Sequence, residues 1–433
     1  MMADRLADRK FDLVVFGATG CAGAYIVEEF VKSEYFGRHS IAVAGRNADK
    51  LRRMLGEVSK HTNTDLSRIE VIIADSSDDA ALDALAKQTR VIVNAAGPFW
   101  KFGEHVIRAA VRNGTSHLDI SGEAVWAERM QVTYNREAKE SGSIVISSCA
   151  FDSIPADLGV QFLRQQFPGT VAYAECFVKF DIPRGYSFNF GTLETVLRVV
   201  ERGDRVDEFR AQLMPEPIEQ PLVKPPKRPP VWRNRSLNGY AIPYPGDRLP
   251  GADDSVVERT QYHEATVNGR RPIPVSIYAL DGTWAEARAK HLWFGVMVGA
   301  VRRPACFRFV LNHPKLASLG TFTTEGPKRE MVKKARFTYF VQGYGWPTEE
   351  PQVDQPPTTK LTVRCDGPDA GYVGTARLIL ASAMTILEER DQMPEGGVFT
   401  PAVAFERTRI FDRLAQWDIT FRVDTSVDPA LMA

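Results

Sequence analysis

The feature that most constrains the fold of this 433-residue chain is a glycine-rich turn between an apolar strand and an amphipathic helix. After the turn, Ala22, Ile26 and Phe30 recur at helical spacing. In a βαβ unit, such glycines permit a tight turn, let the backbone approach a pyrophosphate and allow the helix to pack closely on the strand. The N–H groups at the start of the helix then face the phosphates. We therefore predict a dinucleotide site, with a turn that binds no ligand as the alternative. The predicted contacts are Gly17, Ala18, Thr19, Gly20 and Gly23.

Short apolar runs alternate with amphipathic stretches from Phe11 to Cys149, which is typical of a parallel sheet wrapped by helices. We predict an α/β fold in which residues 9–158 form a doubly wound Rossmann domain. After Gly159 the segments become longer and more aromatic, so we expect a second, mixed α+β domain over residues 159–368. The expected strands of the first domain are FDLVVFG, SIAVAGR, IEVIIAD, RVIVNAAG, SHLDIS and SIVISSC.

The second predicted strand ends in Arg46, where an NAD-binding protein usually carries Asp or Glu. A carboxylate at this place accepts a hydrogen bond from the 2′-hydroxyl of NAD, whereas an arginine donates charge-assisted hydrogen bonds to the 2′-phosphate of NADP. We therefore expect NADP(H) as the cofactor in preference to NAD(H). The alternative is that Arg46 is an ordinary solvated residue.

Further cofactor contacts are expected after the third and fourth strands, because ligands bind at the carboxyl edge of an open parallel sheet. We place Asp75 near the adenine. The small residues that follow Asn94 suit a backbone that passes close to the cofactor, although Pro98 could be only a loop stop. The predicted contacts at this edge are Asp75, Asn94, Ala95, Gly97 and Pro98.

The candidates for acid–base catalysis are three carboxyl groups that follow the fifth and sixth strands, Asp119, Glu123 and Asp152. A buried carboxyl with a shifted pKa can donate or accept a proton beside a nicotinamide. For Asp152 the alternative is a cap on the helix that begins around Pro155. No tyrosine is followed four residues later by a lysine, so the mechanism of short-chain dehydrogenases is excluded.

Charge and cysteine content exclude several classes of partner. Lys plus Arg and Asp plus Glu each number 54, so no net field attracts nucleic acid. The histidines and cysteines form no metal-ligand pattern, and we expect no bound metal. The cysteines are widely spaced, without a secretory signal, so we expect a cytosol-facing protein. They are Cys21, Cys149, Cys176, Cys306 and Cys365.

The motifs together resemble the saccharopine dehydrogenase-like oxidoreductase family, which is similar to trans-acting enoyl reductases and, more distantly, to saccharopine reductases. The resemblance implies a C-terminal segment, 369–433, that packs back on the Rossmann domain, and it repeats the assignment of Gly17, Gly20, Gly23 and Arg46 to the cofactor. It supplies no catalytic residue. The motifs are FDLVVFGATGCAGAYIVEEF, AVAGRNADKL, VNAAGPF, HLDISGE, FDSIPADLG, GYVGTA and GGVFTPAVAF.

Two functions follow from these expectations. The first is an NADPH-dependent reductase that acts on a hydrophobic or lipid-derived carbonyl or enoyl group. The second is a cofactor-binding scaffold or sensor on a lipid surface with little turnover, which the lack of a recognisable acid–base pair favours. Animal members of the family are linked to lipid droplets and membranes, which suggests the same surface for this chain.

One segment, residues 291–311 (HLWFGVMVGAVRRPACFRFVL), is expected to contact a lipid surface. Its apolar run is about half the roughly 20 residues that a membrane span needs. Apolar side chains beside arginines suit a helix that lies in a lipid interface. A buried helix of the second domain, or a contact in a homodimer, is the alternative.

Overall fold

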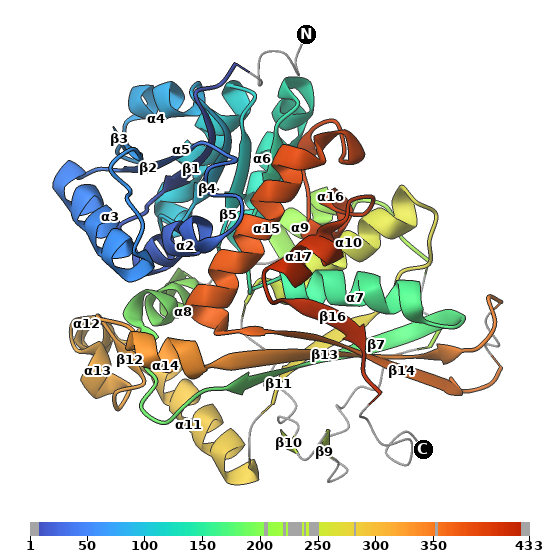
Figure 1. Ribbon diagram of the computed structural model, residues 1–433. Coiled ribbons are helices and arrows are strands. Elements are labelled where there is room, and N and C mark those ends of the chain that lie inside the picture. Colours follow the sequence, from blue (N-terminus) through green and yellow to red (C-terminus); the bar gives the residue numbers. More distant parts are fainter. Residues whose placement is uncertain are drawn as a thin grey trace. The chain divides into compact units, whose positions relative to one another are not determined.

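The computed structural model describes residues 8–202, 207–219, 222–223, 236–237, 240–241, 251–280, 283–350 and 354–425 (Figure 1). Contacts divide the chain into two compact units. Unit 1 comprises Met1–Asp152, Val206–Leu213 and Asp369–Trp417. Unit 2 comprises Ser153–Arg205, Met214–Pro368 and Asp418–Ala433.

Unit 1 contains a seven-stranded sheet in the order β15-β6-β5-β4-β1-β2-β3, and each of its strand pairs is parallel. The predicted doubly wound fold is confirmed, and each predicted strand is present. The seventh strand, β15, comes from the C-terminal segment and pairs with β6. The strands are β1 (Phe11–Phe16), β2 (Ile41–Gly45), β3 (Glu70–Ile73), β4 (Thr89–Asn94), β5 (Ser116–Asp119), β6 (Ile144–Ile146) and β15 (Gly397–Val398).

The helices of unit 1 bury their apolar stripes on this sheet. On one side Val106 and Ala110 of α5 join a cluster with Val14 and Ile92 of the central strands. The helices are α2 (Cys21–Lys32), α3 (Ala48–Thr62), α4 (Asp79–Ala86), α5 (Phe99–Arg112), α6 (Ala124–Ser141), α9 (Asp207–Leu213), α15 (Thr375–Glu388), α16 (Pro401–Ala404) and α17 (Ile410–Gln416), with short turns η2 (Ala370–Gly374) and η3 (Arg390–Gln392).

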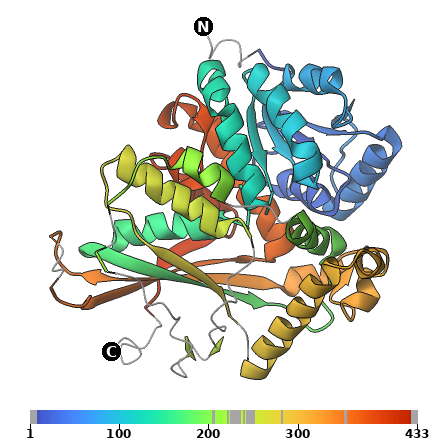
Figure 2. The same cartoon turned by 180° about the vertical axis from the view of Figure 1, so that it is seen from behind.

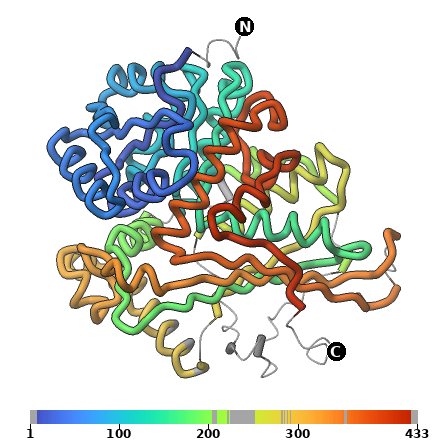
Figure 3. The backbone as a smooth tube through the Cα atoms, in the orientation of Figure 1, coloured from blue at the N-terminus to red at the C-terminus, as the bar shows by residue number. Residues whose placement is uncertain are grey.

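The helix α15 is apolar on nearly all sides and lies against α2, β4 and β5 in unit 1, as the family resemblance implies for this segment. Figure 3 shows this late segment beside the sheet formed by the start of the chain. By length and composition the stretch Ala370–Glu388 could cross a membrane, but 78% of it is buried inside the protein. Burial within unit 1 accounts for its apolar composition.

Unit 2 is built on a mixed sheet in the order β11-β7-β13-β14-β16, which confirms a second domain with a mixed sheet. The long strands β7 and β13 are antiparallel neighbours, and β11 is parallel to β7. The helix α7 packs on β13 and β14. The strands are β7 (Thr170–Asp181), β8 (Phe188–Asn189), β9 (Ser236–Leu237), β10 (Tyr240–Ala241), β11 (Val275–Ala279), β12 (Phe322–Thr323), β13 (Arg336–Trp346), β14 (Thr359–Pro368) and β16 (Thr420–Val423).

Several helices of unit 2 gather at one end of this sheet, as Figures 1 and 2 show for α8 and α11 to α14. The helices are α7 (Ile154–Gln166), α8 (Phe190–Arg202), α10 (Asp253–Thr266), α11 (Trp284–Val301), α12 (Pro304–Asn312), α13 (Pro314–Ala317) and α14 (Arg329–Lys334).

The C-terminal segment does not return to unit 1 as a whole. We expected all of 369–433 to pack on the Rossmann domain, but β16 pairs with β14 of unit 2 through the register Val363↔Val423 to Asp366↔Thr420. The backbone groups of β16 find their hydrogen-bond partners at the edge of the second sheet. Short motifs shared with a family could not indicate this pairing.

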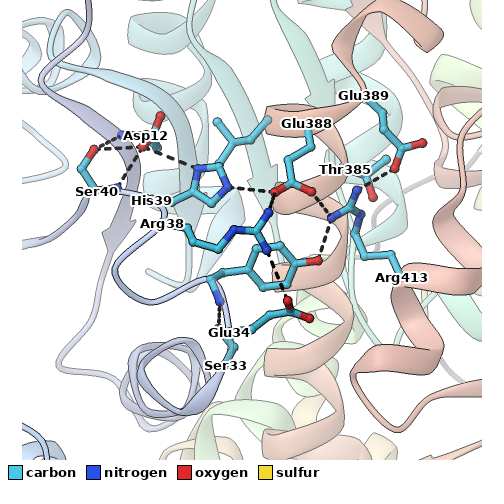
Figure 4. A network of polar contacts seen from close by, with 12 residues as sticks. Asp12, Ser33, Glu34, Arg38, His39, Ser40, Thr385, Glu388, Glu389 and Arg413 are labelled. Carbon is cyan, nitrogen blue, oxygen red and sulfur yellow. Dashed lines mark hydrogen bonds and ion pairs between the residues drawn. The ribbon is translucent and has the colours of Figure 1, made fainter.

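A polar network joins α15 and α17 to the start of the chain (Figure 4). His39 lies between Asp12 and Glu388, with its ring nitrogens 3.6 Å from Asp12 Oδ2 and 3.1 Å from Glu388 Oε1. The buried Arg413 donates to Glu388 Oε2 at 2.6 Å and to Glu389 Oε1 at 2.7 Å. The charged groups of the network are therefore paired with groups of opposite charge or with histidine. These pairs fix the position of α15 relative to the start of the chain.

We expect Arg413→Ala to lower the free energy of unfolding by about 3–5 kcal/mol, because it leaves the buried carboxylate of Glu389 without its nearest cation. Urea denaturation followed by circular dichroism measures the loss. Arg409→Ala is the matched control: this side chain is 78% exposed and lies 3.9 Å from Glu389, so we expect a change of about 1 kcal/mol or less. Equal losses in the two variants would contradict the role of Arg413.

We expect His39→Gln to lower stability more at about pH 5.5 than at about pH 8.5. Hydrogen bonds to Asp12 and then to Glu388, opposed by burial, raise the pKa of His39 above its ordinary value. The protonated histidine therefore stabilises the folded state. This contribution is fully present below the unfolded pKa of about 6.5 and is lost as pH rises through the folded pKa. Urea denaturation of wild type and variant at both pH values measures the difference. The exposed His61, changed to Gln, is the control, and a pH-independent difference for His39→Gln would refute the assignment.

Candidate cofactor and catalytic site

The glycine turn between β1 and α2 is packed so closely that side chains would not fit. Gly17 has a φ of +78°, and a Cβ there would lie 2.7 Å from the Ala96 nitrogen. A Cβ on Gly23 would lie 2.4 Å from the Gly17 carbonyl oxygen. Both glycines are therefore required by the backbone itself, and they bring the turn against the loop that follows β4.

The surface of this turn suits a phosphate. Ala18 is fully buried, whereas Thr19 and Gly20 are exposed at the start of α2. Gly20 is the N-cap residue of α2 and has no side chain with which to cover the first N–H groups of the helix. The positive end of the helix dipole is thus open to an anion, as the predicted pyrophosphate site requires.

Arg46 is exposed directly after β2, next to the start of α3. Asn47 caps α3 by accepting the Lys50 N–H at 2.9 Å. Asp75, after β3, accepts from the Ser77 hydroxyl at 2.7 Å and the Ser77 N–H at 2.9 Å. These bonds, with a smaller contribution from the charge of Arg46, hold the pKa of Asp75 below its ordinary value. The two predicted adenosine contacts follow neighbouring strands of the sheet, β2 and β3.

The predicted cofactor contacts in the loop after β4 differ in exposure. Asn94 is fully buried, and its Oδ1 accepts the Ala96 N–H at 3.0 Å, so its side chain shapes the loop. Ala95 and Pro98 are partly exposed and Gly97 is exposed, with a cis peptide bond between Gly97 and Pro98. The small exposed residues remain the predicted cofactor contacts at this edge.

Asp119 ties together the ends of two strands. It is fully buried at the end of β5, and its Oδ1 accepts the N–H groups of Ser121 and Ser148, both at 3.0 Å. Burial raises the pKa of Asp119 to about 7 although these hydrogen bonds oppose the shift. Asp119 can hold a proton near neutral pH, but its geometry assigns it to positioning the loops after β5 and β6.

His117 lies beside this carboxyl and was not identified from the sequence as a candidate site residue. Its Nδ1 is 3.7 Å from Asp119 Oδ2, and burial lowers the pKa of His117 to about 3, so the ring is neutral. The available signal was the strand period of two, which places residues 117 and 119 on the same face of β5.

Glu123 acts as a cap for a neighbouring helix. The residue is buried, and its two carboxylate oxygens accept the N–H groups of Phe99 at 2.9 Å and Trp100 at 3.0 Å. These are the first residues of α5, whose N-cap Pro98 makes no side-chain cap. The carboxylate therefore supplies the acceptors that α5 lacks, which favours a structural role over proton transfer.

Asp152 is the candidate best placed for proton transfer. It lies in the turn after β6, is partly exposed, and does not cap α7, whose N-cap is Ser153. Burial of its carboxyl raises the pKa of Asp152 to about 6. Its Oδ2 lies 2.8 Å from where a Cβ on Gly122 would be, so glycine leaves the room that this carboxyl occupies beside the loop after β5.

The described part of the chain contains no group of three or more His, Cys, Asp or Glu residues placed to hold a metal ion.

Comparison with known proteins identifies close relatives over nearly the whole chain. Residues 13–146 match the family described as the saccharopine dehydrogenase NADP binding domain. A Caenorhabditis elegans protein named lipid droplet localized protein is 40% identical, with 97% of this chain and 99% of the relative covered. A Homo sapiens saccharopine dehydrogenase-like oxidoreductase is 35% identical, with 96% and 98% covered.

A solved structure shares the fold. The saccharopine dehydrogenase (L-Glu forming) of Saccharomyces cerevisiae aligns with a TM-score of 0.50 at 13% identity, covering 96% of this chain and 100% of that chain. Similarity at this identity indicates the architecture and leaves the chemistry to the site itself.

We expect Arg46→Ala to weaken NADPH binding by about tenfold to a hundredfold and to leave NADH binding nearly unchanged, because one charge-assisted contact to the 2′-phosphate contributes about 1.5–3 kcal/mol. Isothermal titration calorimetry with both cofactors measures the effect. Arg53→Ala removes the same charge from the exposed face of α3 and serves as the control. Equal affinity of the wild type for NADPH and NADH would refute the assignment.

Proposed function

The chain belongs to the saccharopine dehydrogenase-like oxidoreductase family, and we propose that it is an NADPH-dependent reductase of a hydrophobic, lipid-derived carbonyl or enoyl compound. The family's domain binds NADP, and the glycine turn of this chain has the form that the phosphates need. The observation that carries the proposal is Asp152, a partly exposed residue whose buried carboxyl has a raised pKa and lies at the carboxyl edge of the same sheet.

NADPH, when bound, supplies the hydride. Asp152, which is protonated below about pH 6 when nothing else is bound, holds the proton that a reduced carbonyl oxygen must gain. In carbonyl reduction the oxygen would take the proton of Asp152 while the carbon gained the hydride, which would give an alcohol and leave Asp152 as a carboxylate that regains a proton from water. For an enoyl substrate the same proton goes to the carbon α to the carbonyl.

The scaffold reading is supported by a different observation. Of the three carboxyl groups predicted for catalysis, Asp119 and Glu123 use their oxygens to hold backbone N–H groups. A site that retains cofactor affinity with only one free acid would suit a sensor of the NADPH pool with little turnover. Turnover of any compound in a reductase assay separates the two functions.

We expect Asp152→Asn to lower kcat by about 10²- to 10⁴-fold, because it removes the proton donor. The assay follows NADPH consumption with a panel of long-chain aldehydes, ketones and enoyl thioesters. For the wild type, kcat/KM of reduction should fall as pH rises through about 6, since only the protonated carboxyl donates. The variant should lose this pH dependence while calorimetry shows unchanged NADPH affinity.

Asp119→Ala is the contrasting variant. It removes the acceptor of two buried N–H groups, so we expect a loss of about 1–3 kcal/mol of unfolding free energy. A wild type that binds NADPH yet reduces no member of the panel would overturn the reductase proposal in favour of the scaffold.

A further inference from the structure

One face of α11 is apolar and exposed. Leu292, Gly295, Val296 and Gly299 recur with the spacing of a single helix face, and all four are exposed. The side chains of Leu292 and Val296 are 70% and 57% exposed. A Cβ added to either glycine would meet no atom of the described chain within 4 Å, so this stripe is open.

The other face of α11 forms a core within unit 2. Met297 and Val301 are buried in a cluster with Leu193 and Leu197 of α8. Trp293 stacks on Phe322 with ring centroids 6.1 Å apart. Trp293 and Met297 therefore hold the helix in place, and the segment 291–311 is core on one side and surface on the other.

The next two helices and the turn after them also carry exposed apolar side chains. Phe309 of α12 is 48% exposed, Leu316 of α13 is 66% exposed, and Leu319 in the following turn is 87% exposed. Single exposed leucines are ordinary, but several in consecutive helices mark an interaction surface. We name these residues, with Leu292 and Val296, the α11–α13 face.

The sequence that forms this face carries charge of a single sign. No Asp or Glu occurs between Glu286 and Glu325, although the whole chain has equal numbers of acidic and basic residues. All the basic side chains within this interval are exposed. They are Arg288, Lys290, Arg302, Arg303, Arg308 and Lys315.

We propose that the α11–α13 face docks on an anionic phospholipid surface. Its leucines enter the boundary between headgroups and acyl chains, while its arginines and lysines meet the phosphates. In a twofold homodimer through this face, the basic residues of one copy would face those of the other, and the segment offers no carboxylate to pair with them. This repulsion disfavours a second copy of the chain as the partner. The inference is independent of the reductase activity, and it is consistent with the name of the C. elegans relative.

The test is co-flotation of the full chain with phosphatidylcholine vesicles that contain or lack phosphatidylserine. We expect binding to the anionic vesicles, weakened by salt, and a loss of about tenfold or more in the variants Leu292→Ser/Val296→Ser/Leu316→Ser and Arg302→Glu/Arg303→Glu. Thermal stability and NADPH affinity should stay at wild-type values, because these side chains are exposed and lie outside the cofactor turn.

Val267→Ser is the matched control, since this valine is 65% exposed on another part of unit 2. The control should float with the vesicles like the wild type. Wild type that does not float with anionic vesicles, or apolar variants that float as well as wild type, would overturn the proposal. So would analytical ultracentrifugation that shows a dimer broken by the same substitutions.

Discussion

The geometry of the cofactor edge depends on one steric constraint, the approach of the β1–α2 turn to its own helix and to the loop after β4. With a Cβ on Gly23 the Gly17 carbonyl would be only 2.4 Å away, and with a Cβ on Gly17 the Ala96 nitrogen would be 2.7 Å away. Ordinary non-bonded carbon contacts need about 3.5–4.0 Å. The absence of two side chains therefore sets how α2 leaves the sheet, and so where its N–H groups point.

Around this turn, carboxyl groups of one chemical type perform different tasks because their surroundings differ. Asp119 and Glu123 accept buried backbone N–H groups and hold loops and a helix start in place. Asp152 lies in a turn, is partly exposed as a residue, and has a carboxyl whose pKa is raised by burial. A buried N–H group without an acceptor destabilises the fold, so a carboxylate that accepts from one has a structural role. A carboxyl that makes no such hydrogen bond can exchange protons.

Two apolar helices of similar composition have different environments. The helix α15 is buried along nearly its whole length in unit 1, and Arg413 binds its last residue, Glu388, and its C-cap, Glu389. The helix α11 buries only the side that carries Met297 and Val301, and its stripe from Leu292 to Gly299 faces outward. Apolar composition alone is therefore compatible with a core helix and with a docking surface, and packing decides between them.

The sequence by itself determined the parallel sheet, its glycine turn and the expectation of NADP, because these depend on local spacing and on short motifs with a steric cause. It also placed the three candidate carboxyl groups at the right strands. The tertiary structure alone decided which of them is tied to backbone N–H groups, that β15 extends the first sheet, and that β16 joins the second. The physical reason is that hydrogen-bond partners distant in the chain, such as Glu123 with Phe99 or Asp119 with Ser148, carry no periodic signal in the sequence.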